Sequence, residues 1–330
     1  VLDPRGAPEP AFEHGMPPMP AMEMVCGGCA AKVGADPLRR ALARLPAPAP
    51  DPDVLLGLAA ADDVAAWRQG AEVVVANVDA FTAFTDDPWL VGRVAAHNGL
   101  SDLYAKGARP RYALAIVAVP PEPSAEETLF QTLSGARRTL EDAGVALLGG
   151  HTIVAAQLMV GFCVLGSADG PMWTQAGLSP GDHLVLTRAL GTGVLWHADM
   201  AGRATSRWME AVVASMVRGN AAASAVARAF PISAATDVTG FGLAGHVLSM
   251  LAGNGVSARL ALSSLPALPG ALELLAAGER STFHDQNRQA LLSPRIASRR
   301  SSATLGFIAR NTLPTCLQNS RRATRDDQSS

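Results

Sequence analysis

Between residues 72 and 166 the chain alternates short apolar runs with longer amphipathic segments. The runs are rich in β-branched residues and predict buried strands. A helix is predicted from Pro88 to Gly107, and a second is predicted to run to Gly144, opened by Ser124 and Glu127 as a capping box. This alternation predicts a mixed α/β domain. The predicted strands are EVVVANVDAF, RYALAIVAVP, VALLGG and IVAAQLMVGFCVLG.

A Gly/Pro-rich break over residues 166–182 separates this half from the next, and we expect the domain boundary near 168–178. The run HLVLTRALG predicts a strand, and helices are predicted over about 193–229. Residues 232–262 predict a strand, a turn, a helix and another strand. The second half therefore predicts an α+β domain over 178–294.

The two ends of the chain differ from its centre. Residues 1–25 are rich in Pro and Met and predict a disordered arm or interdomain linker, and residues 295–330 predict an atypical, disordered Arg/Ser-rich tail. After the arm, Asp36 caps a predicted short helix with Leu38, Leu42 and Leu45 on one face. With 330 residues, two domains are the expected organisation, the first over 26–168.

Composition narrows the classes of function. A net charge of -2 does not indicate the excess of positive charge that binding to nucleic acid or to an anionic membrane usually requires. No apolar run approaches the roughly 20 residues of a membrane-spanning helix. The four cysteines lie mostly far apart and do not form a disulfide pattern, so we expect a cytoplasmic protein.

Several aspartates stand beside apolar segments, where a carboxylate is costly unless it is paired or binds a cation. Each one alone is compatible with a solvated turn or a helix cap. Their joint recurrence favours a site for a hard cation such as Mg²⁺, with substrate phosphates completing its ligands. These residues are Asp62, Asp63, Asp79, Asp102 and Asp237.

The helix over 89–106 carries Asn98, Asp102 and Lys106 four residues apart, on one face. Such a face is suited to a metal–phosphate unit. Equally, Asp102 and Lys106 are spaced as an ordinary exposed ion pair worth a few tenths of a kcal/mol. The residues alone leave both interpretations open.

Glycine-rich turns are predicted in LLGGHT, between two strands, and in TDVTGFG, at the start of a helix; both are weak signals for anion binding. No P-loop or dinucleotide fingerprint occurs.

The motif CGGCAAK, from Cys26 to Lys32, has four possible interpretations that the residues alone leave open: a zinc clip, a redox pair, a reactive loop and an unremarkable flexible arm. Lys32 is placed to lower the pKa of a cysteine thiol or to hold phosphate oxygens.

Taken together, these motifs resemble those of the selenophosphate synthetase (selenide, water dikinase) family, over about Cys26 to Pro294. The resemblance rests on Cys29-Ala-Ala-Lys32, Asp62-Asp63, NVDAFTAFTDDPWLVGRVAAHNGLSDLYAKGARP, GGHT and TDVTGFGLAGH. It implies the two-domain fold of aminoimidazole ribonucleotide synthetase-like proteins, with the N-terminal sheet pairing across a homodimer and a C-terminal α+β domain. That second domain is expected to be incomplete, because the Arg/Ser-rich tail replaces the family's final segment.

The resemblance implies a reaction in which ATP, selenide and water give selenophosphate, AMP and orthophosphate, for selenocysteine and selenouridine biosynthesis. It also implies several Mg²⁺ ions. By motif position, Cys29 and Lys32 are the implied catalytic residues, and Asp63, Asp102 and Asp237 the implied metal ligands. The implied ATP-contacting residues are Lys32, Asp62, Asp79 and Asp102, with Gly150, His151 and Thr152 reaching ATP from the partner subunit.

Partners and alternatives follow from the same resemblance. A selenium-delivery protein, or a flavin-dependent oxidoreductase domain fused ahead of the chain, is an expected partner.

Two alternative functions remain. One is a related superfamily kinase, such as thiamine-monophosphate kinase, or a hydrogenase-maturation dehydratase; the Cys29-x-x-Lys32 motif argues against both. The other is a catalytically compromised, dimeric ATP-binding module.

Overall fold

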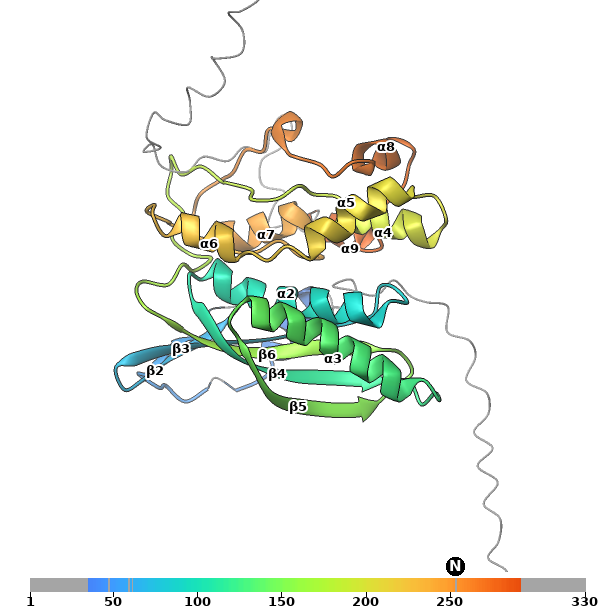
Figure 1. Ribbon diagram of the computed structural model, residues 1–330. Coiled ribbons are helices and arrows are strands. Elements are labelled where there is room, and N and C mark those ends of the chain that lie inside the picture. Colours follow the sequence, from blue (N-terminus) through green and yellow to red (C-terminus); the bar gives the residue numbers. More distant parts are fainter. Residues whose placement is uncertain (1–34, 47, 59, 61, 253, 292–330) are drawn as a thin grey trace, which may run out of the picture.

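A six-stranded sheet forms the first half of the computed structural model, which describes residues 35–291 apart from 47, 59, 61 and 253 (Figure 1). The strand order is β1-β2-β3-β6-β4-β5, and neighbours are antiparallel except for the parallel pair β4 and β5. The strands are β1 (Val54–Leu56), β2 (Ala65–Gln69), β3 (Glu72–Thr82), β4 (Arg109–Val119), β5 (Ala146–Val154) and β6 (Met159–Ala168).

The four strands predicted in this half are confirmed, with one change of boundary. β5 continues through Val154, and β6 begins only at Met159. The prediction of one strand over 153–166 was therefore wrong, because the chain turns back between these two strands. The GGHT motif lies inside β5 and is not a turn between strands.

Two helices, α2 (Pro88–Ala105) and α3 (Ala125–Asp142), cover one face of the sheet (Figure 1). The predicted limits of α2 are confirmed: the Asp87 carboxylate accepts from the Leu90 N–H at 3.0 Å, and Gly107 follows the helix with a φ of +66°. The predicted capping box of α3 is wrong, because the Ser124 side chain makes no capping hydrogen bond. Ser124 instead has a ψ near 0°, outside the extended geometry of a side-chain cap.

Glycines let α2 and α3 approach each other closely. A Cβ on Gly92 would lie 1.9 Å from the Thr132 carbonyl oxygen, and one on Gly135 would lie 2.0 Å from the Trp89 carbonyl oxygen. No side chain fits at either position without moving the helices apart. Because α2 also carries the polar residues of the site described below, this contact fixes their position relative to the sheet.

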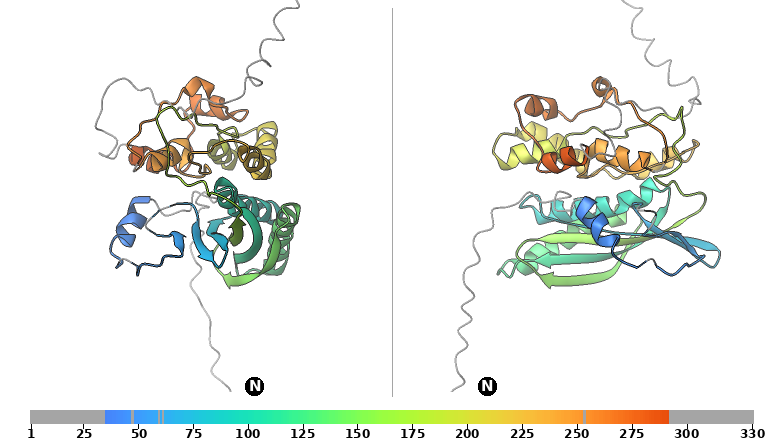
Figure 2. Two further views of the ribbon diagram at one scale, coloured as in Figure 1. Left: turned by 90° about the vertical axis from the view of Figure 1, so that its left-hand side faces the viewer. Right: turned by 180° about the vertical axis from the view of Figure 1, so that it is seen from behind.

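The second half of the described chain is helical and lies on the far side of α2 from the sheet (Figures 1 and 2). Its small core gathers Val194, Leu195, Val212, Ala271 and Leu274. The helices are α4 (Thr192–Met200), α5 (Ser206–Met216), α6 (Ala221–Ala227), α7 (Gly242–Leu251), α8 (Ala271–Ala276) and α9 (His284–Leu291), with a 3₁₀ turn at Leu262–Ser264.

The strands predicted in this second half are wrong for the described residues. Residues 183–189 and the segments flanking α7 are irregular, and Leu190 and Ala267 form an isolated parallel bridge. A β-branched run becomes a strand only when a neighbouring backbone completes its ladder. Along the described part of these segments there are only isolated bridges, such as those at Leu190 and Arg259, and no ladder.

Contacts of α2 and the residues around it join the two halves. The Phe84 and Trp196 rings meet edge to face, with centroids 4.9 Å apart. The Trp173 N–H donates to the carbonyl of Lys106, the residue after α2, at 3.1 Å. The break over 166–182 therefore runs against α2 and is part of the packed structure.

The predicted N-terminal helix is present as α1 (Ala35–Leu42), shorter than its leucine pattern indicated. Leu38 is 51% exposed and Leu45, beyond the helix, is 57% exposed. The predicted arm over 1–25 and tail over 295–330 lie outside the described residues. Across the part of the chain that the structure describes, no helix is both long and apolar enough to cross a membrane.

Replacing Gly92 with alanine is expected to lower the free energy of unfolding by about 1–3 kcal/mol, since the added methyl overlaps the Thr132 carbonyl. Thermal unfolding measures the change. Gly170 is the matched control, because a Cβ there meets nothing within 4 Å. Equal unfolding temperatures for Gly92→Ala and Gly170→Ala would contradict the close helix contact.

Candidate metal and nucleotide site

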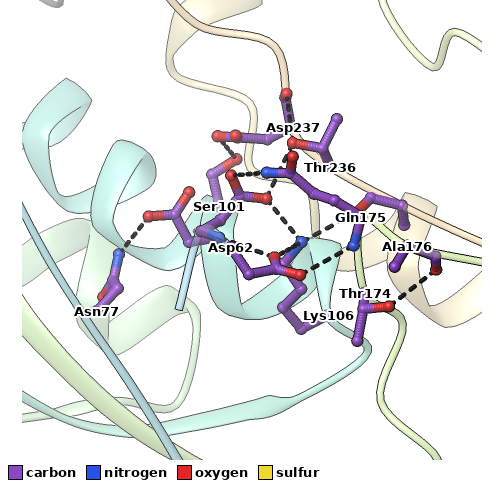
Figure 3. A network of polar contacts seen from close by, with 12 residues as sticks. Asp62, Asn77, Ser101, Lys106, Thr174, Gln175, Ala176, Thr236 and Asp237 are labelled. Carbon is purple, nitrogen blue, oxygen red and sulfur yellow. Dashed lines mark hydrogen bonds and ion pairs between the residues drawn. The ribbon is translucent and has the colours of Figure 1, made fainter. Parts of the chain in front are cut away.

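Three aspartates that are far apart in the sequence meet beside α2. Asp63 precedes β2, Asp102 lies in α2, and Asp237 precedes α7. One carboxylate oxygen from each lies within 4.8 Å of the other two. Figure 3 shows Asp237 reaching towards α2 from the second half of the chain. The structure thus brings together all three residues expected to bind metal.

Asp102 is the most buried of the three, with 9% of its surface exposed. The Asn77 side-chain amide of β3 donates to its Oδ2 at 2.7 Å and to the Gly99 carbonyl at 3.0 Å, which orients the carboxylate. Burial, and after it the nearby Asp237 carboxylate, raise the pKa of Asp102 well above its ordinary value. A cation at this position would relieve both effects.

Asp237 is held by a short relay of polar groups. The Ser101 hydroxyl donates to Asp237 Oδ2 at 2.8 Å, and the Asn220 side-chain amide donates to that hydroxyl oxygen at 2.9 Å. Ser101 belongs to α2, and Asn220 precedes α6. The relay therefore fixes the second half of the chain against the helix that carries Asp102.

Asp62 and Asp63 are held by a residue that the sequence analysis missed. The Gln175 backbone N–H donates to Asp62 Oδ2 at 2.9 Å, and its side-chain amide donates to Asp63 Oδ1 at 2.7 Å. The Thr236 hydroxyl adds a bond to Asp63 Oδ2 at 2.9 Å. Gln175 lies in the predicted Gly/Pro-rich break over 166–182, where composition gave no sign of its role, whereas Thr236 stands next to Asp237 in TDVTGFG.

Lys106 interacts with Asp62 and Asp63 rather than with Asp102. Figure 3 shows the Lys106 side chain beside Asp62. Its ammonium lies 2.5 Å from Asp62 Oδ1 and 2.7 Å from Asp63 Oδ2, and the side chain is fully buried. The interpretation of Asp102 and Lys106 as an exposed i,i+4 pair is therefore wrong. The lysine extends beyond the end of α2, towards the carboxylates that precede β2.

Asp79 lies beside the same helix face. The Asn98 side-chain amide donates a short hydrogen bond to Asp79 Oδ2, and the Asp79 charge adds to the rise in the pKa of Asp102. Asp62, Asp79 and the three clustered aspartates therefore belong to one acidic region along α2.

Gly150, His151 and Thr152 lie elsewhere, in the edge strand β5. They pair with Ala115, Ile116 and Val117 of β4 and are exposed. A Cβ on Gly150 would lie 2.0 Å from the Ala115 carbonyl oxygen, so glycine is required by the close pairing of the strands. Among the contacts of the described chain, none joins this segment to the acidic region.

The TDVTGFG segment leads into α7, as its glycines indicated. Gly242 begins the helix with a φ of +68°, and the Thr239 N–H donates to His246 Nε2 at 3.0 Å. This contact fixes the turn and with it the preceding Asp237.

The residues of the predicted cysteine and lysine motif cannot be placed relative to this site. Cys26, Cys29 and Lys32 lie outside the described residues.

The residues present fit a divalent cation. Three carboxylates within 4.8 Å repel one another when all are ionised, and carboxylate oxygens are the preferred ligands of Mg²⁺ and related ions. Ser101, Asn77 and Gln175 already orient these carboxylates. The site therefore offers preset oxygen ligands, and a polyphosphate can reach it only together with cations that neutralise the aspartates.

Comparison with known proteins identifies the family. Residues 61–168 match the family described as AIR synthase related protein, N-terminal domain, and residues 179–284 match its C-terminal domain. A selenide, water dikinase of Nitratidesulfovibrio vulgaris is 41% identical over 262 residues, covering 76% of this chain and 73% of the relative. The chain belongs to the selenide, water dikinase family. Seven further relatives of that name are 36–40% identical.

Solved structures show the same fold. AaThiL complexed with AMPPCP and TMP superposes with a TM-score of 0.61 at 16% identity, covering 76% of this chain and 78% of that one. A thiamine-monophosphate kinase from Stenotrophomonas maltophilia K279a gives a TM-score of 0.57 at 22% identity, covering 84% and 93%. The fold expected from the sequence, that of AIR synthase related proteins, is therefore confirmed, while the element-level corrections above stand.

Replacing Asp102 with asparagine is expected to stabilise the metal-free protein at neutral pH and to weaken Mn²⁺ binding at least tenfold. The pKa of Asp102 is higher in the folded protein than in the unfolded chain, where it is about 3.9. The folded protein therefore loses stability as the pH rises above that unfolded value. Thermal unfolding in a chelator, from pH 7.5 downwards, measures this gain, which should shrink towards pH 4.

Asp169 is exposed, so Asp169→Asn is the matched control and should change neither quantity. An Asp102→Asn protein that is less stable at neutral pH and still binds Mn²⁺ normally would contradict the assignment.

Proposed function

We propose that this chain is a selenide, water dikinase, which uses ATP, selenide and water to form selenophosphate, AMP and orthophosphate. The observation that carries the proposal is the meeting of Asp63, Asp102 and Asp237 in a chain of this family. We further propose that residues 26–168 form the ATP-binding domain and residues 178–294 the second domain. The acidic region lies where segments from both come together.

The proposed role of the three aspartates is to bind Mg²⁺. Bound Mg²⁺ would neutralise the phosphates of ATP and the charge that develops during phosphoryl transfer. The protein's own contribution is to fix the ligands: Asn77 orients Asp102, Ser101 orients Asp237, and Gln175 orients Asp63. Because these carboxylates are already oriented, they would not have to rearrange when a cation binds, as flexible carboxylates would.

Asp62 and Asp79 are proposed to contact ATP, directly or through its metal ions. Their closeness to the three aspartates supports this, because Asp62 shares the Lys106 ammonium with Asp63, and Asp79 is bonded to Asn98 of α2. Gly150, His151 and Thr152 are proposed to reach the ATP of a partner subunit. Their exposure in the edge strand β5 leaves them accessible to a second chain.

Cys29 and Lys32 are proposed as the catalytic residues. The proposal rests on their motif position and on chemistry: a thiol is a soft group that suits a soft anion such as selenide, and an ammonium three residues away can hold selenide or phosphate oxygens by charge. A segment that closes over the phosphates would also keep water from the γ-phosphoryl group until selenium has attacked.

Replacing Cys29 with serine should abolish selenide-dependent AMP formation and leave nucleotide binding intact, because the thiol is needed only for the selenium step. Cys26→Ser is the matched control and should keep most of the activity. The measurement supplies ATP, Mg²⁺ and selenide and separates AMP, ADP and selenophosphate. Full activity in Cys29→Ser would contradict the catalytic role.

The same assay on the unaltered chain tests the proposed function itself. AMP together with selenophosphate is the expected product pair. Selenide-independent ADP formation would indicate a simple kinase. ATP binding without turnover would indicate a compromised nucleotide-binding module, and either result would overturn the proposal.

A homodimer formed through the open face of the sheet is proposed as the assembly. Among the described residues, helices cover one face of the sheet, and the other face carries a cross-strand row of Val78, Cys163 and Leu114. Val78 is 66% exposed and Leu114 is 39% exposed. Apolar rows of this kind favour burial against a second apolar sheet.

A charge on that row should separate the subunits. Val78→Lys is expected to convert the dimer to a monomer in sedimentation experiments, because an unpaired ammonium is costly inside an apolar interface. Val185, which is 76% exposed in the second half, is the matched control, and Val185→Lys should remain dimeric. A monomeric parent chain, or a dimeric Val78→Lys variant, would contradict the proposed interface.

A further inference from the structure

Lys106 is the most completely enclosed charged group beside the acidic region. None of its side chain is exposed, and its ammonium contacts three oxygens: Asp62 Oδ1 at 2.5 Å, Asp63 Oδ2 at 2.7 Å and the Ala235 carbonyl at 3.0 Å. Two carboxylates and a carbonyl are also a ligand set that suits a divalent cation. The lysine nitrogen thus lies at the centre of a small cage of oxygen atoms.

The cage is assembled from three separated parts of the chain. Asp62 and Asp63 precede β2, Lys106 directly follows α2, and Ala235 lies two residues before Asp237. The Ala235 N–H is in turn bound to the Thr174 carbonyl at 2.9 Å, next to Gln175. The third oxygen of the cage is therefore itself held in place by a backbone hydrogen bond.

One carboxylate links this cage to the proposed metal site. Asp63 Oδ2 contacts the ammonium, and Asp63 is also one of the three clustered aspartates. Asp62, Asp63, Asp102 and Asp237 together carry four negative charges when ionised, and Lys106 supplies one positive charge at fixed geometry. A buried ammonium is expensive unless such partners surround it.

We propose that the Lys106 ammonium occupies a cation position of the acidic site, so that this chain binds one divalent ion fewer than its carboxylates would otherwise hold. Lys106 is then a positioning residue, which fixes Asp63 for the remaining ions. The inference rests on the proposed function in one respect, that Asp63, Asp102 and Asp237 bind metal. It goes further by stating that one cation position of the acidic site is filled by the protein itself, and that Lys106 is the residue that fills it.

The proposal predicts the number of bound ions. Mn²⁺ is titrated into the full chain and counted by electron paramagnetic resonance, first without and then with a non-hydrolysable ATP analogue. Lys106→Ala, which empties the cage, should bind one Mn²⁺ more per chain than the parent. Lys106→Arg, which keeps the charge, should bind the parental number.

A charge-matched double variant separates the effect of the ammonium from that of a cavity. Asp62→Asn combined with Lys106→Ala removes one negative and one positive charge and should return to the parental number of ions. An extra ion in this double variant as well would overturn the proposal, since cavity volume alone would then explain the added binding.

Stability gives a second readout that does not depend on counting ions. Without metal, Lys106→Ala should unfold at a lower temperature than the parent, because Asp62 and Asp63 lose their counter-charge. Saturating Mn²⁺ should raise its unfolding temperature more than that of the parent. If Lys106→Ala folds only in the presence of Mn²⁺, that result supports the proposal, because it shows a metal ion replacing the ammonium.

Failure of this inference is distinguishable from failure of the proposed function. A parent chain that binds no Mn²⁺ would contradict the metal site itself. A parent that binds Mn²⁺, together with a Lys106→Ala variant that binds the same number and gains no extra stability from it, would leave the metal site standing. The role given to Lys106 would then be wrong.

Discussion

Repulsion among buried and half-buried carboxylates is the constraint on which this structure depends. Five aspartates lie along α2, and an acidic group near a core is tolerated only when other charges or donors compensate it. The chain supplies compensation from both halves: Lys106 balances Asp62 and Asp63, Asn77 binds Asp102, and Ser101 binds Asp237. The compensation is incomplete, and this remaining negative charge is the physical basis for the proposed cation site.

The fold serves this arrangement through α2. The glycine contacts with α3 hold the helix on the sheet, and its opposite side receives the second half of the chain. Asp102 and Ser101 therefore lie where two domains meet, and Asp237 reaches them from the second. A site assembled in this way depends on both domains, so the proposed nucleotide binding would be physically linked to domain packing.

The sequence predicted the first half of the fold and the identity of the clustered aspartates, because both have local signals. The strands and α2 show clear periodicity, and Asp63, Asp102 and Asp237 stand in recognisable motifs. It failed where the outcome depends on distant partners. Gln175 lay in the predicted Gly/Pro-rich break, and the spacing of Asp102 and Lys106 could not show that the lysine contacts Asp62 and Asp63. The segment around Val185 lacks the neighbouring strand that would complete a ladder.

The most direct test of the account is to locate the metal ions. Crystals of the full chain grown with Mn²⁺ and a non-hydrolysable ATP analogue would give an anomalous difference map in which manganese positions stand out. The account predicts a peak about 2–2.5 Å from carboxylate oxygens of Asp63, Asp102 and Asp237, between the protein and the nucleotide phosphates. Manganese bound elsewhere, with these three carboxylates making only protein contacts, would contradict it.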